Sequence, residues 1–141
     1  MYGPQPSRLV FLSDLKRMSV GSKARFLGCV DDYDVSTATL TLKHAYPTKS
    51  SVVARVNIEH VLETVQRTDL DVGAWVNVIA YVSAPPNNSK AGVKRARAHS
   101  ATDNVHAQAI VLWSAGDVKL DAYQKAVEAR KAADAIFSAP E

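Results

Sequence analysis

Cysteine is nearly absent from this sequence, because Cys29 is the only one among 141 residues. A single cysteine allows no internal disulfide, which suits a reducing compartment. Long apolar runs are absent too, and without a stretch of about 18 apolar residues we expect no membrane-spanning helix. The first residues show neither the basic region nor the apolar run of a signal peptide. We therefore expect a protein of a reducing compartment without membrane contact.

The residue patterns that carry catalysis or metal binding are also missing. The chain has four histidines, and neither they nor Cys29 show the spacing of zinc ligands. The six glycines form no phosphate-binding loop or dinucleotide fingerprint, and no serine lies in a nucleophile elbow. We therefore expect no enzymatic activity, no catalytic residue, no metal and no cofactor.

Apolar residues are abundant, at 47% of the chain, which is enough for one domain with a core of its own. Apolar and polar residues alternate in several segments with the period of two that is typical of strands. The predicted strands are 22–30, 37–44, 52–58, 75–82 and 105–113. Gly28 inside the first strand predicts a bulge, and the acidic segment 31–34 predicts a polar turn.

Helical spacing occurs in two places. Asn57 can cap a short helical patch with apolar residues on one face, and Asp117 can cap a final helix that runs to about Phe137. Five strands with a short helix between the third and the fourth are the order of an OB-fold barrel. The sequence thus predicts an all-β core with helices. Its parts are an N-terminal extension over 1–20, a five-stranded OB-fold barrel over 21–116, and a C-terminal helix over 117–141 that packs on the barrel and on a partner.

Positive charge is concentrated in one segment. The chain has 17 Lys and Arg against 14 Asp and Glu, and the segment 85–102 holds four of these basic residues and no acidic one. It follows the fourth predicted strand, and oligonucleotides meet OB-folds at that loop and on strands two and three. Basic side chains there would neutralise phosphates, and an aromatic ring or guanidinium could stack on a base. The predicted DNA-binding residues are Lys43, Tyr46, Lys90, Lys94, Arg95 and Arg97. The alternative is a solvated loop without a ligand.

The final helix carries the predicted partner-binding residues. Leu120, Tyr123 and Val127 form an apolar stripe at helical spacing, and Arg130 would continue it as a polar rim residue. Arg25, on the outward face of the first strand, could be covered by the same partner. The alternative is that the stripe packs only against the barrel of its own chain.

Several segments resemble one family in the same order. They are Leu9-Val10-Phe11-Leu12-Ser13-Asp14-Leu15, Gly21-Ser22, Arg25-Phe26-Leu27-Gly28-Cys29-Val30, Val72-Gly73-Ala74-Trp75-Val76-Asn77-Val78-Ile79 and Val111-Leu112-Trp113-Ser114-Ala115-Gly116. Together they are similar to the smallest, Ten-type subunit of the fungal CST telomere-capping complex. The similarity runs from about Leu9 to the final helix.

This resemblance implies a single OB-fold with a terminal helix, in a heterodimer with an Stn-type OB-fold subunit. The pair would mirror the two smaller subunits of replication protein A. It would join a larger CST subunit, bind single-stranded telomeric DNA mainly as a complex, and support polymerase α–primase indirectly. The expected location is the telomeric region of chromosomes in the nucleus. Two alternatives stay open: a small structural subunit of replication protein A, and a stand-alone module that binds single-stranded nucleic acid.

Overall fold

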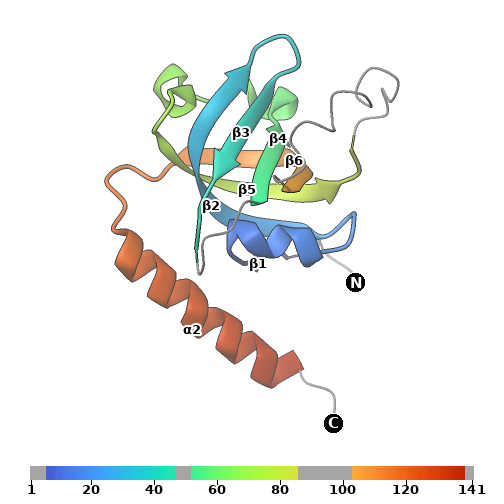
Figure 1. Ribbon diagram of the computed structural model, residues 1–141, viewed down its shortest axis with the longest axis vertical. Coiled ribbons are helices and arrows are strands. Elements are labelled where there is room, and N and C mark those ends of the chain that lie inside the picture. The colour runs from blue at the N-terminus through green and yellow to red at the C-terminus, as the bar shows by residue number, and fades with distance from the viewer. Residues whose placement is uncertain (1–5, 47–51, 86–102, 139–141) are drawn as a thin grey trace.

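The computed structural model describes residues 6–46, 52–85 and 103–138. Figure 1 shows a β-barrel with one long helix lying outside it. The strands are β1 (Arg8–Leu9), β2 (Lys23–Asp34), β3 (Thr39–Lys43), β4 (Val52–Asn57), β5 (Trp75–Ser83) and β6 (Asp103–Ser114). Three short 3-10 helices are η1 (Leu12–Arg17), η2 (Glu59–Val61) and η3 (Arg67–Leu70), and the long helix is α2 (Leu120–Ser138).

The barrel closes through the pairing of β2 with both β3 and β5. Around the barrel the order is β2, β3, β4, β6 and β5, with β4 and β6 parallel and the other neighbours antiparallel. β1 adds a short parallel pairing at the start of β2. The five-stranded OB-fold barrel is therefore confirmed, with one further strand in the described residues.

Alternation along the strands fills the barrel. β5 is buried at every second residue from Val76 to Val82, and β4 in the same way from Val52 to Val56. η1 adds Leu12 and Leu15, which are 0% and 1% exposed and belong to the same core. The segment 1–20 therefore contributes to the barrel core through its described part.

β2 differs from its prediction in length and in the position of its irregularity. It continues through the acidic segment to Asp34, so the prediction of a polar turn over 31–34 is wrong. The turn follows instead at 35–38, where Ala38 has a φ of 53°. The bulge that was expected at Gly28 lies between Val30 and Asp32. The extra residue bends the strand there and increases its local twist.

The helical patch after β4 is also different from its prediction. The chain forms the 3-10 helices η2 and η3 where one short helix was expected. Asn57 is not the N-cap, which is Ile58 and makes no side-chain cap hydrogen bond. The Asn57 Oδ1 instead accepts a hydrogen bond of 3.0 Å from the Glu59 N–H, one residue before the N-cap position. None of the helices in the described ranges is long and apolar enough to cross a membrane.

Candidate partner-binding and nucleic-acid surfaces

The long helix α2 is seated on the outside of the barrel, beside η1 and the start of the chain (Figure 1). Val127 of α2 is 0% exposed. Phe11 and Leu27 are buried as deeply, although neither belongs to the core cluster inside the barrel. These three side chains therefore mark an apolar layer between α2 and the outer wall of the barrel.

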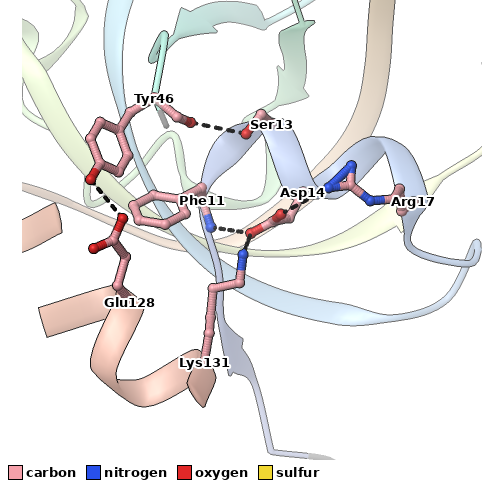
Figure 2. Close-up of polar contacts among 7 residues, drawn as sticks. All are labelled: Phe11, Ser13, Asp14, Arg17, Tyr46, Glu128 and Lys131. Atoms are coloured by element: carbon pink, nitrogen blue, oxygen red, sulfur yellow. Dashed lines mark hydrogen bonds and ion pairs between the residues drawn. The ribbon is translucent and has the colours of Figure 1, made fainter. Parts of the chain in front are cut away.

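Two polar contacts fasten α2 at the edge of this layer, as Figure 2 shows. The Tyr46 hydroxyl donates a 2.6 Å hydrogen bond to Oε2 of Glu128. The Lys131 Nζ lies 2.7 Å from Oδ2 of Asp14 and 5.1 Å from the centre of the Phe11 ring. Asp14 Oδ2 also accepts a hydrogen bond of 2.9 Å from the Phe11 N–H. The position of the carboxylate is therefore fixed independently of Lys131. A charge-assisted contact to a pre-positioned acceptor loses little side-chain entropy.

Aromatic rings surround His44 under the helix. The His44 ring centre lies 5.4 Å from that of Trp75 and 6.2 Å from those of Phe11, Tyr46 and Tyr123. His44 is 5% exposed, and its Nε2 lies 3.1 Å from Nε2 of Gln124 on α2. Burial lowers the pKa of His44, and burial raises the pKa of Tyr123 to about 12. Both groups are therefore kept neutral where α2 meets the barrel.

The predicted partner-binding residues fall on different surfaces. Val127 is fully buried within this chain, and the Tyr123 ring lies against His44, so both face the barrel. Packing on the chain's own barrel is thus what the structure shows for these two residues. Leu120 is half-buried and Arg130 is exposed, with an ion pair of 3.4 Å to Asp134. A contact of these residues with a partner stays a prediction.

A groove of about 370 Å³ lies where an OB-fold meets oligonucleotides. It runs from the turn after β2, across the outward faces of β3 and β4, to the end of β5 and the start of β6. Its lining residues are Asp34, Thr37, Thr39, Arg55, Asn57, Ser83, Ala84, His106 and Ala107. Burial and the nearby Arg55 guanidinium lower the pKa of His106. Arg55 is the basic side chain in this lining, and amides and hydroxyls provide the other hydrogen-bonding groups.

Of the predicted DNA-binding residues, the two in the described part of the chain, Lys43 and Tyr46, do not line this groove. Lys43 is exposed at the end of β3, where its Nζ lies 3.1 Å from Oδ1 of Asp31. The Tyr46 ring packs against Phe11 with ring centres 4.9 Å apart, and its hydroxyl donates a hydrogen bond to Glu128, so Tyr46 contributes to the contact between α2 and the barrel. Lys90, Lys94, Arg95 and Arg97 lie outside the described residues.

Two groove residues escaped the sequence analysis. Arg55 alternates with buried Ala54 and Val56, so the predicted third strand already placed its side chain outward. His106 carried no such signal, because only the parallel pairing of β6 with β4 sets it opposite Arg55. Within the described residues, no group of three or more His, Cys, Asp or Glu side chains is arranged to hold a metal ion.

Residues 1–128 match the family model described as Ten1: telomere capping, CST complex subunit. The chain belongs to the Ten1 family. A Ten1-family chain is a telomere-capping subunit of the CST complex, and this confirms the resemblance found in the ordered segments. No curated protein sequence matches the chain.

Solved structures share the fold of this Ten1-family chain at low identity. The Stn1–Ten1 complex of S. pombe matches with a TM-score of 0.63 and 18% identity, covering 92% of this chain and 95% of the matched one. Ten1 from S. pombe matches with a TM-score of 0.63, 19% identity and coverages of 89% and 98%. Replication protein A of U. maydis bound to single-stranded DNA matches with a TM-score of 0.54 and 19% identity, covering 96% of this chain and 97% of the matched one. The family match therefore favours the CST subunit over the small subunit of replication protein A.

Proposed function

We propose that this Ten1-family chain acts without catalysis in the nucleus, as a subunit that pairs with an Stn-type OB-fold protein through the outward face of α2. The observation that carries the proposal is the two-sided character of this helix. One side holds Val127 against the barrel, while the opposite side is left exposed. One of the S. pombe matches is a chain of an Stn1–Ten1 complex, and 95% of that chain is covered.

The outward face of α2 suits another helix. Ala122, Ala126, Ala129 and Ala133 follow one another at intervals of four, three and four residues, which places them in one line along the helix. The first three are exposed and the fourth is half-buried. Alanines in a line let a second helix approach closely, and Arg130 borders this line as a charged rim. We call these four residues the alanine line.

The alanine line can be tested with matched lysine substitutions on one helix. The double variant Ala126→Lys and Ala129→Lys places two long charged side chains in the line, and lysine keeps a high helix propensity. Because these side chains would hold a partner helix away, we expect the affinity for the Stn-type subunit to fall at least 100-fold in a titration followed by calorimetry. The control is Ala132→Lys, an exposed site on α2 outside the line.

The outcome separates pairing from folding. Ala132→Lys should bind the Stn-type subunit like the unchanged chain, and all variants should keep the same thermal unfolding midpoint. If the double variant still pairs normally, the outward face of α2 is not the interface. If the chain instead pairs with the middle subunit of replication protein A and not with an Stn-type protein, the alternative assignment holds.

The groove across β3 and β4 supports a second, weaker contribution to function. We propose that it contacts single-stranded telomeric DNA once the subunits are assembled. Arg55 offers one cation for a phosphate, and the groove lining has Asn57 and His106 for base edges. The described residues of this lining include no Phe, Tyr or Trp, and stacking supplies much of the affinity for single strands. The isolated chain should therefore bind DNA weakly, with polymerase α–primase served only through the complex.

A further inference from the structure

Arg55 of β4 and His106 of β6 stand side by side in the groove across β3 and β4. The two strands are parallel, and Arg55 is the register partner of His106. Each is flanked along its own strand by two buried residues, so both side chains lie on the outward face, and both line the groove. Neighbouring strands lie about 4.8 Å apart, so the guanidinium and the imidazole can reach the same ligand group.

The other groups around His106 come from three elements. β5 places Ser83 beside His106, on the side opposite β4, and the outward neighbours on β6 are the uncharged Asn104 and Gln108. His106 and Ser83 also line an adjoining cavity of about 200 Å³, to which η1 contributes Lys16. Among the described residues, neither lining includes a residue of η2. Arg55 and Lys16 are thus the charged groups nearest to the ring, and both are cations.

The charges of the groove lining cancel as long as His106 is neutral. Among the described residues of this lining, Arg55 carries a positive charge and Asp34 a negative one. The Ser36 hydroxyl donates a 2.7 Å hydrogen bond to Oδ1 of Asp34 and lowers the pKa of that carboxyl, so Asp34 stays ionised. A lining without net charge attracts an anionic strand only weakly. A proton on His106 would leave one excess positive charge in the groove.

Arg55 also influences the protonation of His106. Burial and the nearby Arg55 guanidinium lower the pKa of His106, so the ring is neutral near pH 7 in the free protein. An anion held between the two side chains would offset the repulsion from Arg55 and attract a proton to the ring. Because coupling between two ligands is reciprocal, a proton on His106 must then strengthen the binding of the anion.

We propose that Arg55 and His106 together hold one phosphodiester of a single strand, and that His106 takes up a proton from the solvent as the strand binds. The protonated ring and the guanidinium each donate a charge-assisted hydrogen bond to the phosphate oxygens. This rests on the proposed function, in which the groove contacts single-stranded DNA and a neutral His106 would meet a base edge. Proton uptake assigns His106 to the backbone instead, so its contact adds affinity without reading sequence.

The experiment titrates the assembled complex with a single-stranded telomeric oligonucleotide that lacks terminal phosphates, so that the charge of its backbone stays constant with pH. We expect the affinity to rise about fivefold from pH 7.5 to pH 6.0, within the limit of about tenfold per pH unit that one proton allows. Calorimetry in two buffers of different ionisation enthalpy measures the proton uptake directly, and we expect up to one proton for each complex formed.

Three variants assign the pH dependence to one ring. His106→Gln keeps a hydrogen-bond donor but binds no proton, so most of the rise in affinity should disappear. His106→Lys carries its charge at both pH values, so at pH 7.5 it should bind about as tightly as the unchanged complex does at pH 6.0. The matched control is His60→Gln, which removes an exposed imidazole outside the groove lining and should keep the full rise.

The outcomes separate this proposal from the proposed function. The proposal is overturned if His106→Gln and the unchanged complex show the same pH dependence of affinity. It is also overturned if His106→Gln weakens binding equally at both pH values, because a neutral ring then meets a base edge and the proposed DNA contact stands. The DNA contact itself fails on another measurement, namely equal salt slopes for Arg55→Gln and the unchanged complex. Thermal unfolding at each pH checks that every variant is folded.

Discussion

Gly28 lies in the barrel wall at a point where no side chain fits. A Cβ built at this position would stand 2.8 Å from Cβ of Leu42 and 3.2 Å from Cδ1 of Leu12. The glycine is therefore required by the close approach of β3 and η1, and not by a bulge. The alternating sequence located the glycine in a strand correctly, but the neighbour that demands it comes from residues far along the chain.

Gly28→Ala should destabilise the protein by about 1–3 kcal/mol, because backbone or side-chain atoms must shift to make room for the methyl group. The free energy of unfolding from urea titration measures this loss. A change within about 0.3 kcal/mol of zero would contradict the close approach. Ala24→Gly, at another buried position in β2, tests the opposite change: it leaves a small void and should destabilise by about 1 kcal/mol.

The element that decides the shape of the candidate interface is α2. Its seat combines the buried Val127, the bond between Tyr46 and Glu128, and the contact between Lys131 and Asp14. The helical stripe was visible in the sequence, and so was the alternative of packing on the barrel. Periodicity could not distinguish packing on a partner from packing on the barrel. An apolar stripe has to be buried, but its spacing does not indicate which surface buries it.

We expect the stability of the contact between α2 and the barrel to depend on pH through His44. Burial lowers the pKa of His44, so the unfolded chain takes up a proton at higher pH than the folded chain does. The stability from neutral His44 is complete above its ordinary pKa of about 6.5 and falls as the pH drops below that value, by at most about 1.4 kcal/mol per pH unit. The free energy of unfolding should therefore decrease from pH 7.5 to pH 5.5.

His44→Gln should remove part of this decrease, since glutamine binds no proton in that range and can still meet Gln124. The pKa of His106 is lowered by burial as well, so His106→Gln should remove a second part while leaving α2 seated. Urea titrations at the two pH values measure both effects. An unchanged pH dependence of the free energy of unfolding in His44→Gln would contradict this role of the His44 ring.

At the scale of the whole molecule, the groove and the alanine line are built from different residues, the groove on the barrel and the line on α2. The proposed contacts with DNA and with the Stn-type subunit therefore use different residues and do not compete. Of these surfaces, the groove is the one whose position follows from the OB-fold itself, because its residues gather where β3, β4 and β6 meet.

Arg55→Gln tests the groove. It removes one cation, so the slope of log affinity against log salt for a single-stranded telomeric oligonucleotide should become about 0.7 shallower, with a severalfold loss of affinity. The assembled complex is measured by fluorescence anisotropy. Arg67→Gln, an exposed arginine on η3, is the control and should leave the slope unchanged. Equal slopes for Arg55→Gln and the unchanged protein would exclude a phosphate contact at Arg55.

Local pattern was enough for the class of fold and for the order of its elements. Strands of period two, a break after the third strand and a final helix predict an OB-fold, because side-chain alternation and turn residues act over a few neighbours. Local pattern gave wrong predictions where an element depends on contacts distant in the sequence, or where a 3-10 turn had to be distinguished from an α-helix. The segment 31–34 continues β2 through its pairing with β3, and the expected helix after β4 formed two 3-10 turns.

The sequence by itself determined the barrel, its inward and outward residues, and the ordered segments that belong to the Ten1 family. The tertiary structure decided which outward residues stand together. It brought Tyr46 under α2, set His106 across from Arg55, and placed Arg25 over Trp113. Strand alternation fixes the side of a sheet on which a residue lies, whereas its neighbours on that side depend on strand order and register.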